Sequence, residues 1–374
     1  MNKKIFITIG VVAVIAIGVV VLMQHKQENH DKKTVNIAAI LSLTGSGAEY
    51  GNDQLRAIEL VKESLKNTET KYNYNFIVQD SKSTPKDAIQ AYNNISVVNR
   101  IDVVMSILST VSSSLQPITD KDSIPLFFTG STPGITQSTN LVFRSLPTSD
   151  YQTESLVKNF FSSHKAESSV SILYLNDDYG IGNAQSFKRE LQKQGNMKIL
   201  SEEAINTNDK NGRIILTKII RDNPDCLFIA FYSKALANIL RQLKELNYKG
   251  QILTPIEISY PEVLELAGSA ANDAVFVGNS TKPQDEKSIN FVENYVAKYK
   301  TQPTLDAIYA FDEMQVIINT IEENGYSLDT FRKLKGNSEY NSPNGYFKIN
   351  SLGDFEYEMT LFTIKNGKIV EVKK

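Results

Sequence analysis

Two clusters of hydroxyl residues are the first candidates for a chemical role. Residues 109–114 follow a buried strand predicted over 102–108, and residues 129–134 follow the next strand, predicted over 125–128. Ligands of open α/β sheets bind beyond the carboxyl ends of the strands, and a helix N-terminus flanked by neutral hydroxyls suits a carboxylate. The same Ser and Thr residues could instead only cap helices. The sequence leaves both interpretations open.

The residue types that most catalysis needs are few and scattered. The chain has one cysteine, Cys226, and three histidines. Cys226 belongs to an apolar run and is expected to be a buried structural thiol. A glycine-rich segment, 45–51, has the spacing G-x-G-x-x-x-G, which differs from the dinucleotide fingerprint. Because neither a nucleophile–base pattern nor a cluster of metal ligands is found, we expect no enzyme activity, no metal and no cofactor.

Length and charge narrow the class of protein. At about 150 residues per domain, 374 residues predict two domains. Hydrophobic residues make up 41% of the chain and charged residues 22%, as in ordinary globular proteins. The 40 Lys and Arg are balanced by 42 Asp and Glu, giving a net charge of −2. Without a basic excess, we expect no nucleic-acid partner.

The first residues, 1–33, predict a membrane anchor or signal segment followed by a polar linker. An uncharged run from Ile5 to Met23 is long enough to span a bilayer core, and two lysines precede it. No small-x-small cleavage site and no cysteine follow this run. The pattern favours an uncleaved anchor over a cleaved signal and excludes a lipoprotein anchor. Either alternative predicts an extracytoplasmic location, in the periplasm or on the outer face of the cytoplasmic membrane.

Strands and helices alternate through most of the chain after Thr34. This alternation predicts βαβ units with parallel sheets covered by helices on both faces. The pattern restarts after Asp150, so the fold class is α/β with two lobes. The predicted strands of the two series are 35–41, 76–78, 102–108 and 125–128, then 170–175, 197–204, 226–231, 251–254 and 274–277.

The C-terminal part of the chain breaks this rhythm. Two helices, 286–300 and 305–323, are predicted to follow each other without a strand between them. Asn366-Gly367 predicts a hairpin, because both residues tolerate a positive φ. A helical tail for one lobe and a β tail for the other would take the chain between the lobes more than once. The predicted strands of this β tail are 345–349, 358–364 and 368–372.

Several short motifs occur in a characteristic order. They are Leu43-Thr44-Gly45 with Tyr50-Gly51, residues 80–88, residues 112–117, Phe143-Arg144, Asp178-Tyr179-Gly180 and Leu240-Arg241-Gln242. Together they resemble the type I periplasmic binding proteins, the leucine-binding-protein-like solute-binding components of branched-chain amino-acid ABC transporters. The resemblance extends from about Val35 to the C-terminus.

The resemblance implies two doubly wound parallel-sheet lobes joined by three crossover segments. The first lobe would comprise residues 34–149 and 279–337, and the second lobe residues 150–278 and 338–374. The ligand of such proteins lies between the lobes, which close on it by a hinge. The last residues of the chain would therefore contribute helices to one lobe and strands to the other.

The resemblance also assigns roles to the hydroxyl clusters and to one acidic residue. Ser112 and Thr132 would hold a ligand carboxylate, with Gly130 and Ser131 supplying backbone contacts beside them. Glu257, after a strand of the second lobe, would take a ligand ammonium group through a charge-assisted contact. The alternative for Glu257 is an exposed charge on a loop.

Three tyrosines would line the cleft in the same resemblance. Tyr50, Tyr179 and Tyr232 would present large amphipathic rings to the ligand. Each ring by itself could equally belong to the core or to the rim of the cleft. The positions that choose among amino-acid side chains have no recognisable motif.

These features predict a solute-binding protein that captures an amino acid, branched-chain or a similar small carboxylate, and delivers it to the permease of an ABC importer. A membrane-anchored ligand sensor with a separate signalling partner is the alternative. A cytoplasmic repressor of the same fold would need a basic helix-turn-helix before Val35, where an apolar run stands instead.

Overall fold

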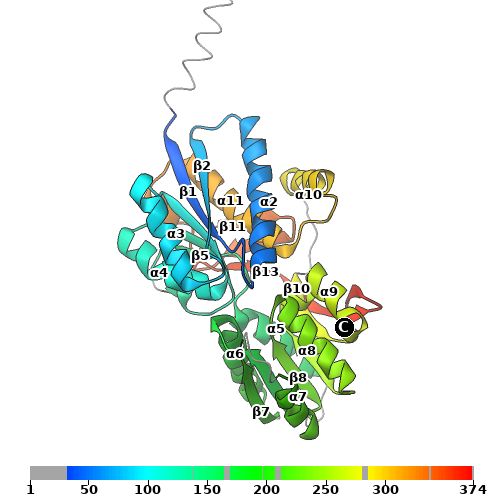
Figure 1. Cartoon of the computed structure of the whole chain (residues 1–374). Coiled ribbons are helices and arrows are strands. Elements are labelled where there is room, and N and C mark those ends of the chain that lie inside the picture. The colour runs from blue at the N-terminus through cyan, green and yellow to red at the C-terminus, as the bar shows by residue number, and fades with distance from the viewer. Residues whose placement is uncertain are drawn as a thin grey trace, which may run out of the picture.

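The computed structural model describes residues 32–137, 139–163, 169–195, 197–206, 212–279, 285–336 and 338–372. The predicted apolar segment from Ile5 to Met23 lies outside the described residues. Within those residues, no helix combines the length and the apolarity that crossing a bilayer requires. The described chain forms two lobes stacked end to end, each with a central sheet (Figure 1).

The first lobe is built on a five-stranded parallel sheet with the order β2-β1-β3-β4-β5. β1 is buried on both faces, because Ile37 and Ala39 belong to the core shared with α2 and α11, whereas Ala38 and Ile40 belong to the core shared with α3. These elements are β1 (Thr34–Leu41), α2 (Ala48–Lys66), β2 (Asn73–Asp80), α3 (Pro85–Val98), β3 (Val103–Ile107), α4 (Ser109–Asp122), β4 (Leu126–Thr129), η1 (Ile135–Gln137), β5 (Val142–Arg144) and α11 (Leu305–Asn324).

The second lobe is built on a seven-stranded sheet with the order β15-β14-β10-β9-β8-β6-β7. The strands from β6 to β10 are parallel, and β14 and β15 add an antiparallel edge. Its elements are α5 (Ser149–Ser163), β6 (Ser169–Leu175), α6 (Asp178–Gln194), β7 (Lys198–Ile205), α7 (Gly212–Arg221), β8 (Cys226–Ala230), α8 (Ser233–Glu245), β9 (Gln251–Thr254), η2 (Ile256–Ser259), α9 (Pro261–Ala267), η3 (Gly268–Ala270), β10 (Val275–Asn279), β14 (Met359–Lys365) and β15 (Lys368–Glu371).

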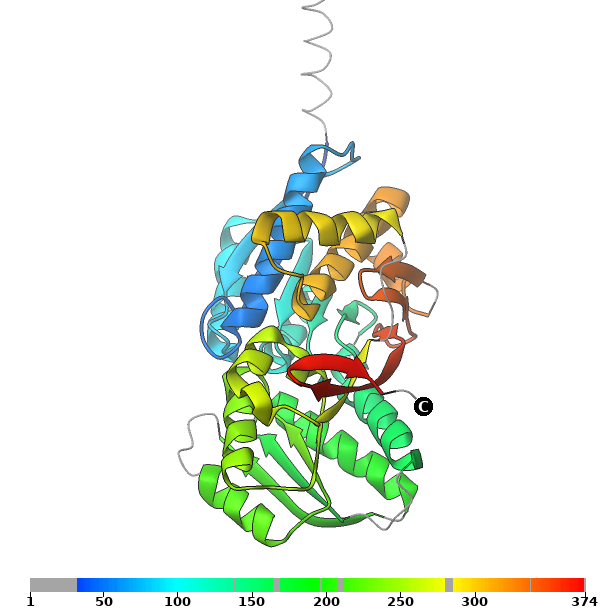
Figure 2. The same ribbon diagram turned by 90° about the vertical axis from the view of Figure 1, so that its right-hand side faces the viewer.

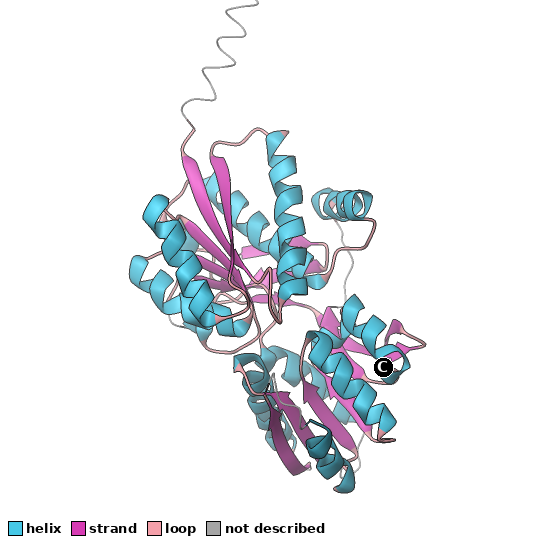
Figure 3. Ribbon diagram, viewed as in Figure 1, coloured by secondary structure: helices cyan, strands magenta, loops and turns pink. Residues whose placement is uncertain are grey.

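The predicted α/β class with doubly wound parallel-sheet lobes is confirmed. Helices cover both faces of each sheet, as Figures 2 and 3 show. The chain passes between the lobes after β5, after β10 and after β13 (Phe355–Tyr357). The predicted hairpin is also present between β14 and β15, where Asn366 and Gly367 have φ angles of 52° and 71°.

The C-terminal segment divides differently from the prediction. β11 (Ser338–Ser342), β12 (Gly345–Ile349) and β13 form a separate antiparallel sheet. This small sheet packs on α11 of the first lobe, where Ser342 donates a hydrogen bond of 2.6 Å to the buried Asp312. Residues 338–357 therefore lie with the first lobe, and only the later strands join the second sheet. The helices α10 (Glu286–Tyr299) and α12 (Leu328–Arg332) precede this segment.

A fully buried arginine ties this small sheet to the first lobe. Arg144, at the end of β5, has an exposed fraction of 0%, and its Nε lies 2.9 Å from Oδ1 of Asp354. The same guanidinium donates a 2.6 Å hydrogen bond to the carbonyl of Thr132. Burial lowers the pKa of Arg144, and the Asp354 carboxylate opposes that shift. One side chain therefore fixes both the β12–β13 turn and the loop after β4.

Replacing Asp354 tests the importance of this pair. Asp354→Asn would leave the arginine charge buried without its partner, and we expect the free energy of unfolding to fall by about 3–5 kcal/mol. Denaturant unfolding followed by circular dichroism measures the change. Glu339→Gln is the control, because Glu339 and Lys348 form an exposed pair on the same small sheet. Equal effects of the two substitutions would contradict the prediction.

Candidate ligand-binding cleft

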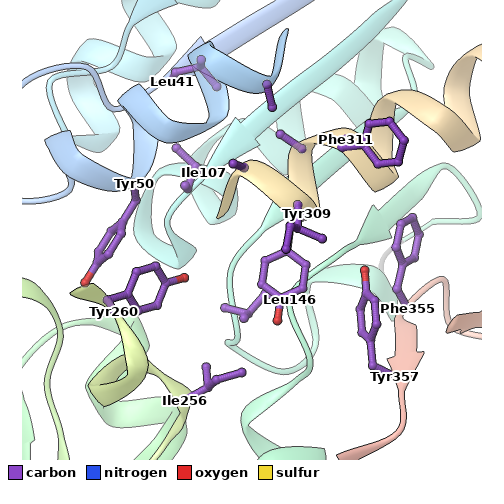
Figure 4. Packing of buried hydrophobic residues seen from close by; sticks show 14 of the residues in the cluster. Leu41, Tyr50, Ile107, Leu146, Ile256, Tyr260, Tyr309, Phe311, Phe355 and Tyr357 are labelled. Carbon is purple, nitrogen blue, oxygen red and sulfur yellow. The ribbon is translucent and has the colours of Figure 1, made fainter. Parts of the chain in front are cut away.

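A cavity lies between the lobes, beyond the carboxyl ends of both sheets. The empty space between the lining side chains is about 450 Å³, part of which is open to solvent. Figure 4 shows that Tyr50 and Tyr260 meet here from opposite lobes. The residues lining the cavity are Tyr50, Ile107, Leu108, Ser109, Thr110, Thr129, Gly130, Ser131, Leu146, Asp177, Tyr179, Tyr232, Glu257, Tyr260 and Asp306.

Two Tyr-Gly pairs, one in each lobe, place aromatic rings in this cavity. A Cβ on Gly51 would lie 2.2 Å from the carbonyl oxygen of Ser42, and a Cβ on Gly180 would lie 1.9 Å from that of Leu175. Only glycine lets the first turn of α2 or α6 approach the preceding strand so closely. The adjacent tyrosines, Tyr50 and Tyr179, consequently face the cleft from both sides.

The tyrosine rings form a connected aromatic wall. The rings of Tyr50 and Tyr260 have centroids 4.9 Å apart, and those of Tyr179 and Tyr232 are 5.3 Å apart, both edge to face. The hydroxyl of Tyr50 also accepts a 2.7 Å hydrogen bond from the backbone N–H of Ser233. Tyr50, Tyr179 and Tyr232 line the cavity together with Tyr260, which the sequence pattern did not indicate.

The two hydroxyl clusters also meet at the cavity, with a shift in the residues that face it. Gly130 and Ser131 line it, but Ser112 does not, because its hydroxyl is buried in a 2.8 Å hydrogen bond with Ser106. α4 begins at Ser109 rather than at the predicted Ser112, after Leu108 turns the chain with a φ of 75°. The cavity wall therefore has Ser109 and Thr110 in the place expected for Ser112.

Thr132 lies beside the cavity and not in its lining. Its hydroxyl donates a 2.8 Å hydrogen bond to the carbonyl of Asp178 across the two lobes. Its backbone N–H donates to the hydroxyl of Ser109 at 3.2 Å. Thr132 thus links the lobes beside the cavity, while α4 presents its N-terminal N–H groups to the cavity.

Glu257 lies in the wall of the cavity and not on an exposed loop. Its side chain is in η2 and the residue is 5% exposed. Its Oε2 has no hydrogen-bond partner among the described residues. Burial raises the pKa of Glu257 to about 7, although the hydroxyl of Tyr179 opposes this shift. A buried carboxylate with an unused oxygen is suited to a cationic partner.

Two further carboxylates that the sequence pattern did not indicate line the same cavity. Asp177 is fully used, because it caps α6 through the N–H of Gly180 at 2.8 Å and accepts the hydroxyl of Tyr232 at 2.9 Å. Asp306, in the first turn of α11, is 3% exposed, and burial raises its pKa to about 8. Its distant position in the chain gives no local signal, because α11 reaches the cleft only through the tertiary fold.

In the described part of the chain, no three His, Cys, Asp or Glu side chains are grouped to hold a metal ion.

A cavity between two α/β lobes, at the carboxyl ends of both sheets, is typical of two-lobed binding proteins. The chain belongs to the periplasmic binding protein family, in its leucine-binding-protein-like group, and the sequence profile of the family matches residues 34–368. It is 25% identical over 354 residues to the leucine-, isoleucine-, valine-, threonine- and alanine-binding protein of Pseudomonas aeruginosa. The aligned region covers 91% of this chain and 92% of that protein.

Solved structures agree with this assignment of the fold. A leucine-binding protein from Thermotoga maritima has a TM-score of 0.82 and 21% identity, with 91% of this chain and 98% of that one covered. A solute-binding protein of an ABC transporter from Rhodopseudomonas palustris, in complex with 3,4-dihydroxybenzoic acid, has a TM-score of 0.80 and 17% identity, with 91% and 96% covered. The same fold therefore accepts ligands of different chemistry.

The Tyr-Gly geometry predicts contrasting effects for two glycines of α6. Gly180→Ala would push a Cβ into the Leu175 carbonyl, and we expect the free energy of unfolding to fall by about 1–3 kcal/mol or more. Gly182→Ala is the matched control, because its Cβ would have its nearest neighbour at 3.4 Å. Thermal and urea unfolding measure both variants. A Gly180→Ala protein as stable as Gly182→Ala would contradict the close approach.

A buried acid under the cavity predicts a pH dependence of stability. Glu313 accepts hydrogen bonds from Thr129 at 3.1 Å and Ser145 at 2.6 Å, and burial raises its pKa from 4.5 to about 8. The folded protein therefore holds a proton that the unfolded chain loses, so this contribution to stability declines as the pH rises from 4.5 to 8. Urea unfolding at several pH values should show a shallower decline for Glu313→Gln than for the wild type. If the free energy of unfolding changes with pH equally in the two proteins, the prediction for Glu313 is wrong.

Proposed function

We propose that the chain is an extracytoplasmic solute-binding protein that captures an amino acid in the interlobe cavity and delivers it to an ABC importer. One observation carries the proposal. One wall of the cavity has the hydroxyls of Ser109 and Ser131 beside the N-terminus of α4. Another part of the wall has Glu257, a buried carboxylate with one oxygen that has no hydrogen-bond partner among the described residues. An α-amino acid has the complementary pair of charged groups. The names of the relatives support the same class of ligand.

The binding mode follows from these opposed groups. The α-carboxylate would meet the N-terminus of α4 and the hydroxyls of Ser109, Thr110 and Ser131. The α-ammonium would meet Glu257 in a charge-assisted hydrogen bond, which also favours the ionised carboxylate. A ligand without an amine, such as an aromatic acid, would leave that carboxylate unpaired and would bind more weakly.

Closure of the lobes would report that the ligand is bound. The hydrogen bonds from Ser233 to Tyr50 and from Thr132 to Asp178 join the lobes and would break in an open form. A permease that recognises both lobes together would distinguish the closed protein from the open one. Energy for import would come from a separate ATPase.

We propose that the rigid units are residues 34–149 with 285–357, and residues 150–279 with 359–372.

The location is part of the proposal. The apolar run from Ile5 to Met23 would hold the protein at the outer face of the cytoplasmic membrane, or would direct its export. A tethered binding protein remains close to its permease, so capture and delivery would occur at the same membrane surface.

Ligand binding by the full chain, purified in mild detergent, tests the function. A panel of common amino acids is compared by thermal unfolding, where a ligand at 100 times its Kd adds about 2.7 kcal/mol and raises the midpoint by a few degrees. Glu257→Gln should weaken the best ligand about 10- to 150-fold in calorimetric titration, the loss of one charged hydrogen bond. Glu265→Gln, on the exposed side of α9, is the control. If no amino acid shifts the midpoint, or if both variants bind alike, the proposal fails.

A further inference from the structure

The cavity contains a second acidic group that an ordinary neutral amino acid would leave without a partner. Asp306 is 3% exposed, lines the cavity, and has no hydrogen-bond partner for its Oδ2 among the described residues. It lies in the first lobe, whereas Glu257 lies in the second. Two acids with unused oxygens therefore line the same cavity from opposite lobes.

The described lining of the cavity supplies no cation to balance these acids. Of the described residues that line the cavity, none is Lys, Arg or His. Asp53 is also buried close to Asp306, but its carboxylate is paired with Arg56 at 2.6 Å and does not line the cavity. A neutral amino acid would bring one ammonium for Glu257, and Asp306 would stay either protonated or buried as an unpaired charge.

A purely structural role explains Asp306 poorly. An acidic residue in the first turn of a helix favours the positive end of the helix dipole. However, α11 already has a capping residue, because the Thr304 hydroxyl accepts the N–H of Ala307 at 3.4 Å. Burial raises the pKa of Asp306, and the neighbouring Tyr260 hydroxyl opposes this rise without cancelling it. A carboxylate kept at this energetic cost inside a ligand cavity is best explained by the ligand.

We propose that the ligand is an amino acid with a cationic side chain, whose α-ammonium binds Glu257 and whose second basic nitrogen binds Asp306. This inference rests on the proposed function and narrows its substrate class. Lysine, ornithine and arginine each carry a second basic nitrogen at the end of the side chain, so one such ligand can present a separate cation to each of the two acids. Tyr260 lines this cavity and also a neighbouring one, so a long side chain that reaches past Tyr260 would find further space there.

The proposal also predicts a change in protonation. The pKa of Asp306 is raised to about 8 by burial, so at pH 7 the free protein holds a proton there. A cation bound to Asp306 favours its ionised form, and binding should release that proton. Norleucine, which has the shape of lysine without the terminal amine, should release less.

The experiment compares lysine, ornithine and arginine with norleucine and leucine on the full chain in mild detergent. Calorimetric titration at pH 7, in two buffers of different ionisation enthalpy, gives both affinity and proton release. We expect at least one basic amino acid to bind about 10- to 150-fold more tightly than norleucine, as one charged hydrogen bond predicts. Asp306→Asn should abolish this preference and the extra proton release.

Two variants separate this role from a structural one. Asp53→Asn is the matched control, because it changes a buried acid beside Asp306 outside the cavity, and it should keep the preference for the basic ligand. Asp306→Glu should keep part of it, since the charge is retained. The inference is overturned if the wild-type protein binds norleucine or leucine more tightly than every basic amino acid. It is also overturned if Asp306→Asn leaves the ratio of the affinities for the basic amino acid and norleucine unchanged. If amino acids of neither kind bind, the proposed function itself fails.

Discussion

The close approach of two helices to two strand ends determines the shape of the cleft. Gly51 and Gly180 remove the side chain that would collide with the carbonyl oxygens of Ser42 and Leu175. Each helix can therefore begin directly over its sheet, with a tyrosine facing the other lobe. Because both lobes use the same device, the carboxyl ends of the two sheets face one another across an aromatic lining, and the polar groups at those ends become parts of one site.

The site combines acids whose burial is costly with a fold that holds them in place. Glu257, Asp306 and Glu313 all have pKa values raised by burial. Each of the three keeps one oxygen without a hydrogen-bond partner among the described residues, but Glu313 accepts two hydroxyl hydrogen bonds on its other oxygen and does not line the cavity, whereas Glu257 and Asp306 do. The free energy that the unliganded protein loses in this way is available for recovery when a cation binds. Affinity and selectivity for a basic group would thus come at the expense of stability without the ligand.

Most of the fold was predictable because its signals are local. Alternating apolar runs and amphipathic segments define the βαβ order, and the hairpin at residues 366–367 follows from two residues that tolerate positive φ. The polar strand β11 and the short strands β5 and β13 lack such a pattern and were missed. Both hydroxyl clusters contribute residues to the lining of the cavity, but the turn at Leu108 starts α4 earlier, so Ser112 is not in that lining. Asp306 could not be predicted as a cavity residue, because only the tertiary fold brings α11 to the cleft.

The three passages of the chain between the lobes also constrain the order in which the molecule can mature. The first lobe needs α11, which packs along α2, and the small sheet that ends at Tyr357. The second lobe needs β14, which pairs with β10. Neither half is a continuous stretch of sequence, so neither can complete its core while the chain is still being synthesised from its N-terminal end. The first lobe can complete its core only after residues up to Tyr357 have been made, and the second lobe only after β14 has been made.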